Sequence, residues 1–227
     1  DFLKNKALNN NAYISYQVFP EGSLSLSSRE DVQRFNDFIK TSYTGNSFLD
    51  VGCGILQLPG YLEFTRDIES TIVGLDPIDR KDFKGVRIVG VSEYIPLIDH
   101  CVENVIFETS LDHVVDLSKT IRETKRVLKK NGKVFLWMSD KSMTIKEKFL
   151  SWYNRRKKSL FQGYDVDIYW VYENYAVFEV PRGGADPFHS YFETPHETSK
   201  LFEKYGFEVS LTKVYSKNEV FLSYQSE

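Results

Sequence analysis

The feature that most constrains this 227-residue chain is a short buried strand that ends in a glycine turn. The apolar run over 47–51 predicts the strand, and Gly52 and Gly54 follow it directly. Glycines at this point let the backbone approach a ligand closely, and the next helix aims its N-terminal amides at an anionic group. Asp76 ends a second β-rich run, where an acid commonly accepts hydrogen bonds from the two ribose hydroxyls. Together these residues predict an adenosine-binding site.

The first part of the chain predicts an α/β fold. Apolar runs rich in β-branched residues alternate with helical patterns, which is typical of βαβ units around a parallel sheet. Strands are expected over 47–51, 71–75, 86–89, 102–107 and 133–138. Helices are expected from a capping box of Ser27 and Glu30, after the glycine turn through Leu58 and Phe64, and over 117–128. Asn131 and Gly132 predict a turn before the fifth strand.

The chain changes in character after residue 140. Residues 145–160 predict an amphipathic helix, and 167–171 with 175–180 predict a β-hairpin that turns near Glu173 and Asn174. A helix over 195–205 and an antiparallel pair of strands, 207–214 and 219–224, are expected at the end. We therefore expect a single domain over 1–227, made of a cofactor-binding core (28–140), a substrate cap insertion (141–194) and a C-terminal helix with a strand pair (195–227).

The composition excludes several classes of protein. It is 41% hydrophobic and 27% charged, which is close to the globular average, so neither a disordered nor a fibrous chain is expected. A net charge of -3 is too small for the whole surface to bind nucleic acid or a membrane. Two cysteines suit a reducing compartment, and no apolar run approaches the roughly 20 residues that span a bilayer. We expect a cytoplasmic protein, with a removed leader left open because the chain begins at Asp1.

Four stretches of the sequence carry a resemblance to a known superfamily. In order, they are 49–54, 73–76, 90–97 and 126–133. They resemble the first motif, the second motif, the loop before the fourth strand and the turn before the fifth strand of class I S-adenosylmethionine-dependent methyltransferases. The resemblance covers residues 45–140. It implies a Rossmann-like sheet of seven mostly parallel strands with an antiparallel last strand, helices on both faces, and S-adenosyl-L-methionine as the cofactor that leaves as S-adenosyl-L-homocysteine.

The resemblance also implies roles for residues at the cofactor. Asp50 and the backbone of the two glycines face the methionine end, Asp76 holds the ribose, and Pro77 and Ser92 lie beside the adenine. The chain departs from the pattern at Leu56, where a third glycine is frequent, and at Val91, where an acid often accepts from the adenine amino group. Glu93 or a backbone carbonyl is expected to substitute for that acid. The cofactor candidates are Asp50, Gly52, Gly54, Asp76, Pro77, Ser92, Glu93 and Glu108.

The candidates for the chemical step lie after the fourth strand and late in the chain. Methyl transfer from a sulfonium is an in-line displacement, so the protein mainly positions the nucleophile and, for a hydroxyl, removes its proton. His113 matches a histidine that is often structural in relatives, and His189 lies in a segment resembling one that faces the acceptor in small-molecule and glycan methyltransferases. Glu108 and Asp112 are expected either to orient a substrate group or to cap a helix. The substrate candidates are Asp112, Tyr191, Arg182 and Trp152.

Two further patterns keep two interpretations each. The basic run 154–158 predicts a solvated helix face or, with Arg182, a clamp for a phosphorylated or nucleotide-linked acceptor. Six aromatic side chains either line the acceptor pocket or form the core of the insertion. They are Tyr13, Tyr16, Phe19, Trp152, Tyr169 and Trp170.

The sequence thus predicts a methyltransferase that acts, without a metal ion, on a small-molecule or glycan-type acceptor, most simply at oxygen, as a monomer or homodimer. Residues 108–111 lack the Asn/Asp-Pro-Pro-aromatic run typical of enzymes that methylate base amines, which argues against nucleic acid. One alternative, motivated by Val91, is a non-catalytic binding or regulatory protein with the same fold. Another is a dinucleotide-dependent oxidoreductase, against which Gln57 argues because a third glycine is expected there.

Overall fold

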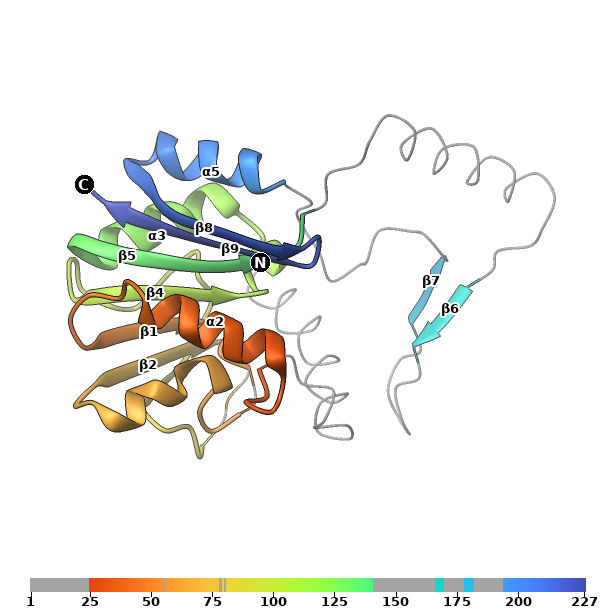
Figure 1. Ribbon diagram of the computed structural model, residues 1–227, viewed down its shortest axis with the longest axis horizontal. Helices are drawn as coiled ribbons and strands as arrows, with labels where there is room; N and C mark the ends of the chain where they lie inside the picture. Colours follow the sequence, from red (N-terminus) through yellow and green to blue (C-terminus); the bar gives the residue numbers. More distant parts are fainter. Residues whose placement is uncertain are drawn as a thin grey trace.

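A seven-stranded sheet forms the centre of the molecule (Figure 1). The computed structural model describes residues 25–54, 56–77, 79, 81–140 and 194–227, and the backbone of 166–169 and 178–181. The sheet has the order β3-β2-β1-β4-β5-β9-β8. Its strands are β1 (Ser47–Val51), β2 (Thr71–Asp76), β3 (Val86–Val89), β4 (Val102–Glu108), β5 (Leu128–Met138), β8 (Phe207–Ser216) and β9 (Glu219–Ser226).

The directions of the strands confirm the predicted Rossmann-like, mostly parallel sheet. Strands β1 to β5 pair in parallel, whereas β9 runs antiparallel to both of its neighbours, β5 and β8. The carboxyl ends of the five parallel strands therefore meet at one edge of the sheet, where open α/β sheets bind ligands. The turn between β8 and β9 reaches the same edge, because β9 begins beside the carboxyl end of β5.

Helices cover both faces of the sheet (Figure 1). Helix α2 (Glu30–Lys40) and the 3-10 helix η2 (Gly60–Asp67) pack on one face, and α3 (Leu117–Val127) with α5 (Pro195–Lys204) packs on the other. Side chains alternate along each strand, so that Phe48 of β1 faces α2 while Leu49 faces α3. Because both faces are buried, the parallel strands are almost continuously apolar, which is the pattern that the sequence displays.

Three local predictions differ from the structure. Ser27 and Glu30 form no capping box: the N-cap of α2 is Arg29, whose N–H donates to the carbonyl of Leu26 at 3.1 Å. The helix after the glycine turn is a 3-10 helix that starts at Gly60, directly after Pro59. Asn131 and its neighbour Gly132 lie inside β5, where the pairing with β4 shifts register and Asn131 has a φ of 61°.

The insertion is described only in part. Strands β6 (Val166–Tyr169) and β7 (Phe178–Pro181) pair antiparallel and form a separate two-stranded sheet. The expected hairpin turn near residue 173 and the expected helix over 145–160 lie outside the described residues. The division of the chain into a core, a cap and a C-terminal part stays a prediction.

Glu103 joins β1 to β4 at the edge of the sheet opposite the glycine turn. Its Oε2 accepts hydrogen bonds from the N–H groups of Asn46 and Ser47 at 2.8 and 2.9 Å, and its Oε1 lies 2.9 Å from Nζ of Lys129. Burial alone would raise the pKa of Glu103, but the hydrogen bonds from Lys129 and Ser47 lower it to about 2. The carboxylate is therefore a structural anion.

We expect Glu103→Gln to lower the free energy of unfolding by about 2 kcal/mol at pH 7, because several donors lose a charged acceptor. A depressed carboxyl pKa stabilises the fold above its unfolded value of 4.5 and loses that contribution as the pH falls through about 2. The difference between variant and wild type should thus shrink between pH 4.5 and pH 3, as measured by urea denaturation. Glu69→Gln, at an exposed position, is the control, and a difference independent of pH would contradict the prediction.

Candidate functional site

The glycine turn leaves β1 at the carboxyl edge of the sheet. Gly52 and Gly54 have positive φ values of 79° and 63°, and the N–H of Gly52 donates to the carbonyl of Leu75 at 2.8 Å. A Cβ atom on Gly52 would lie 2.5 Å from Cβ of Ser110, so packing requires glycine there. A Cβ atom on Gly54 would have no atom within 4 Å in the described part of the chain. The turn is thus packed at Gly52 and open at Gly54.

Asp76 lies directly beside this turn. It ends β2, which pairs in parallel with β1, and its Oδ2 accepts a hydrogen bond from the N–H of Gly54 at 3.0 Å. The side chain is largely buried, and a carboxylate oxygen can accept more than one hydrogen bond. The structure therefore brings together the two features from which the sequence predicted an adenosine site.

Asp50 is a fully buried carboxyl in β1, two residues before the turn. The hydroxyl of Tyr61, in η2, lies 2.9 Å from both of its oxygens and donates to the carboxyl group. Burial raises the pKa of Asp50 to about 8, against the hydrogen bond from Tyr61 and with the negative charge of Glu108 adding to the effect. At neutral pH this carboxyl is mostly neutral, and a nearby cation would favour its ionised form.

Glu108 ends β4 and lies on the same face of the sheet as Asp50. Asp50 is two positions after Phe48, and Glu108 is two positions after Ile106. Both of these apolar residues face α2, and alternate residues of a strand share a face. Its Oε2 accepts a hydrogen bond from the hydroxyl of Ser25 at 3.0 Å. Its Oε1 is buried and has no hydrogen-bond partner among the residues that the structure describes. Burial raises the pKa of Glu108 to about 7, in spite of the Ser25 hydrogen bond. An unsatisfied buried carboxyl oxygen fits a ligand with a hydrogen-bond donor or a positive charge.

The loop after β3 holds the next predicted residues. The hydroxyl of Ser92 lies 2.8 Å from that of Thr120, and Oε1 of Glu93 accepts from the N–H groups of Val115 and Asp116 at 2.6 and 3.1 Å. These contacts fasten the loop to the beginning of α3. Pro77 follows Asp76 and is half-buried. The expected adenine contacts of Pro77, Ser92 and Glu93 stay predictions.

The acceptor candidates are divided between described and undescribed parts of the chain. His113 and Asp112 lie in the 3-10 helix η3 (Leu111–His113), which follows β4 at the carboxyl edge, and their side chains approach each other at 3.8 Å between Nε2 and Oδ1. His189, Tyr191, Arg182 and Trp152 lie outside the described residues, as do the basic run 154–158 and all the aromatic candidates except the backbone of Tyr169. In the described ranges, no three His, Cys, Asp or Glu side chains are grouped to hold a metal ion.

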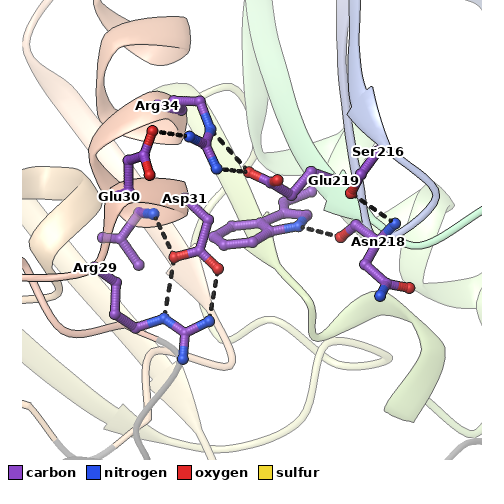
Figure 2. Close-up of polar contacts among 9 residues, drawn as sticks. Arg29, Glu30, Asp31, Arg34, Ser216, Asn218 and Glu219 are labelled. Carbon is purple, nitrogen blue, oxygen red and sulfur yellow. Dashed lines mark hydrogen bonds and ion pairs between the residues drawn. The ribbon is translucent and has the colours of Figure 1, made fainter.

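The beginning of α2 borders this edge and is fixed by ion pairs (Figure 2). Arg29 makes two hydrogen bonds to Asp31, at 3.0 and 2.6 Å, and Arg34 lies 2.7 Å from Glu219 at the start of β9. The indole N–H of Trp137, in β5, donates to a carbonyl of the β8–β9 turn at 3.0 Å. Helix α2, β5 and the β8–β9 hairpin are thereby joined next to Glu108.

Sequence reasoning missed three side chains of the site, namely Ser25, Tyr61 and Arg87. Ser25 and Tyr61 carry no sequence signal, because each meets its carboxyl partner only through packing. Arg87 donates to the sulfur of Cys53 at 2.6 Å and lies 3.8 Å from Oδ1 of Asp76. The sequence signal for Arg87 is that it is a charged residue inside the short, otherwise apolar strand β3.

Comparisons with known proteins agree with the geometry. The family model described as a methyltransferase domain matches residues 49–136, whereas no curated protein sequence matches the chain. Among solved structures, an S-adenosylmethionine-dependent methyltransferase of Methanosarcina mazei is 17% identical over 83% of this chain and 96% of its own, with a TM-score of 0.59. An S-adenosylmethionine-dependent methyltransferase of Thermotoga maritima, named as a possible histamine N-methyltransferase, is 17% identical over 100% of this chain and 99% of its own, with a TM-score of 0.58.

A third structure contains ligands. The 1,6-didemethyltoxoflavin-N1-methyltransferase of Burkholderia thailandensis, with 1,6-didemethyltoxoflavin and S-adenosylhomocysteine bound, is 7% identical over 100% of this chain and 90% of its own. Its TM-score is 0.62. At these identities the three structures establish a shared fold. In the described part of this chain, no helix is both long and apolar enough to cross a membrane.

Proposed function

We propose that this chain is a class I S-adenosylmethionine-dependent methyltransferase, which transfers a methyl group to a small-molecule or glycan-type acceptor at a hydroxyl oxygen. The observation that carries the proposal is the contact between Gly54 and Asp76 at the carboxyl edge of the sheet. It sets an acid that can accept from two ribose hydroxyls next to a backbone turn with open space in front of it. We assign the ribose to Asp76 and the methionine end to Asp50 and the glycine turn.

The pair of buried carboxyls suits the charge of this cofactor. When bound, the cofactor supplies an electrophilic methyl group on a sulfonium, next to the α-ammonium of its methionine end. Asp50 and Glu108 lie near the carboxyl ends of β1 and β4, close to where these positive charges would lie. Both carboxyls have raised pKa values because they are buried without a cation in direct contact in the described structure. A positive ligand would favour their ionised forms and thereby strengthen its own binding.

The chemical step requires that the acceptor be positioned and deprotonated. The acceptor oxygen forms a bond to the methyl carbon as the carbon–sulfur bond breaks, and the hydroxyl proton passes to a base of the protein. We propose His113 and His189 as candidate bases, and Asp112, Tyr191, Arg182 and Trp152 as acceptor contacts. Glu108 supports the same chemistry, because its pKa is about 7 and its Oε1 has no hydrogen-bond partner in the described part of the chain, so that it can take a proton near neutral pH.

Titration calorimetry with S-adenosylmethionine and S-adenosylhomocysteine tests the proposal. We expect wild type to bind both, and Asp76→Ala to weaken the binding of each about 30-fold, because two charge-assisted hydrogen bonds to the ribose are lost. Asp67→Ala, at an exposed position in η2, should leave both affinities unchanged. Absence of binding to the wild type, or equal affinities of wild type and Asp76→Ala, would overturn the assignment.

A further inference from the structure

Arg87 is a buried arginine on β3 that reaches the glycine turn across β2. It pairs in the sheet with Gly74, and only 7% of its side chain is exposed. Its Nη1 donates to the carbonyl of Gly54 at 3.1 Å and to the sulfur of Cys53 at 2.6 Å. Its Nη2 lies 3.8 Å from Oδ1 of Asp76.

Gly74, which pairs with Arg87, leaves room for the two side chains that contact the guanidinium. A Cβ atom at Gly74 would lie 2.7 Å from the sulfur of Cys53 and 2.7 Å from the ring of Phe83. The guanidinium of Arg87 lies over that same ring, 5.6 Å from its centroid. Burial also raises the pKa of Cys53 well above its ordinary value, so the sulfur that accepts from Arg87 is a neutral thiol. The strand, the ring and the thiol together hold the guanidinium in one place.

Arg87, Gly54 and Asp76 form a closed set of contacts. The N–H of Gly54 donates to Asp76, its carbonyl accepts from Arg87, and the guanidinium faces the other oxygen of Asp76. The N–H and the carbonyl of Gly54 are therefore both held by side chains, those of Asp76 and Arg87. The positive charge also offsets the cost of burying the Asp76 carboxylate, which the ribose hydroxyls need as an ionised acceptor.

We propose that Arg87 is a positioning residue of the cofactor site, which holds the Asp76 carboxylate and the Gly54 turn in the arrangement that receives the ribose. The proposal rests on the proposed function, since it assumes that S-adenosylmethionine binds at this turn. Arg87 acts through Asp76 and Gly54 and is not itself a ligand contact.

The test is calorimetry with S-adenosylhomocysteine as the probe, applied to Arg87→Met and Arg87→Lys. We expect Arg87→Met to raise the Kd about 30-fold, because one charged group and its hydrogen bond to the turn are lost. Arg87→Lys keeps the charge but lacks the planar fork, so its Kd should rise less, by about fivefold. Lys129→Met is the matched control: it removes a cation from an ion pair at the opposite edge and should reduce stability without changing the Kd.

A double-mutant cycle separates this role from general support of the fold. If Arg87 acts partly through Asp76, Arg87→Met should raise the Kd by a smaller factor in an Asp76→Asn background than in the wild type, because only its hydrogen bond to the Gly54 carbonyl remains to be lost. The proposal would be overturned if Arg87→Met raised the Kd by the same factor in the wild type and in Asp76→Asn. It would also be overturned if folded Arg87→Met had the Kd of the wild type. If Arg87→Met does not fold, Arg87→Lys decides in the same way. Failure of the wild type to bind S-adenosylhomocysteine would instead contradict the proposed function, so the two failures are distinguishable.

Discussion

Gly54→Ala is expected to weaken the binding of S-adenosylmethionine and S-adenosylhomocysteine at least about 100-fold while the fold is retained. The new Cβ atom would meet no described atom within 4 Å, so it projects into the open space in front of the turn. This is where the backbone must approach the cofactor closely. The positive φ of 63° adds a cost to the folded state of about 1 kcal/mol for a residue with a side chain.

Gly206→Ala is the matched control for this substitution. Gly206 follows α5, has a φ of 76°, and a Cβ atom there would be 3.5 Å from Nζ of Lys125, which is ordinary contact. Both variants should lose about the same stability in urea denaturation, because both place alanine at a positive φ. Only Gly54→Ala should lose affinity in calorimetry. Equal affinities of the two variants would show that no ligand approaches the backbone at Gly54.

Glu108→Gln is expected to stabilise the unliganded protein at pH 8 by about 3 kcal/mol, although it weakens cofactor binding. Burial raises the pKa of Glu108 from 4.5 to about 7, so the wild-type fold is favoured by the neutral carboxyl and loses that contribution as the pH rises from 4.5 through 7. Glutamine does not ionise and keeps the contribution at all pH values. The advantage of the variant should therefore be small at pH 4.5 and complete at pH 8.

Urea denaturation at pH 4.5, 6 and 8 measures the gain in stability of Glu108→Gln, and calorimetry at pH 8 measures its loss of affinity for the cofactor. We expect the affinity for S-adenosylmethionine to fall about tenfold in Glu108→Gln, because one of two carboxyls facing a cationic ligand is neutralised. Glu208→Gln, at an exposed position, should change neither quantity. A stability difference that is the same at all three pH values would show that Glu108 does not ionise across this range.

The strands of the sheet could be predicted well, because a buried parallel strand appears in the sequence as a short apolar run. The bounds expected for β1 and β3 agree with the structure, since short apolar runs limited by polar residues have few alternative lengths. The 3-10 helix η2 was expected as an ordinary helix, because its apolar residues Tyr61 and Leu62 fit either period over so short a segment. Asn131 was expected in a turn, but a residue at positive φ also fits a strand irregularity.

The candidate site was predictable only where chemistry and sequence spacing coincide. Asp50, the two glycines and Asp76 lie at fixed points of successive strands, so their proximity follows from parallel pairing. The partners of the carboxyls do not follow in this way. Ser25 and Glu108 are 83 positions apart, and the hydroxyl that reaches Asp50 comes from a residue that the sequence marks only as apolar core. Tertiary packing brings these partners together, and no local sequence pattern indicates which residues will meet.

The hydrogen bond from Ser25 to Glu108 also bears on where a working recombinant fragment has to begin. The family match covers residues 49–136, but Ser25, helix α2 and the β8–β9 hairpin all lie outside it. The carbonyl of Ser25 accepts from the N–H of Gly60 at 2.8 Å, so the segment before α2 is bound to η2 as well as to Glu108. A fragment trimmed to the match would lose α2, which covers one face of the sheet together with η2, and would lose the hydrogen bond from Ser25 to Glu108. The smallest unit that keeps these contacts is therefore larger than the segment that the family model matches.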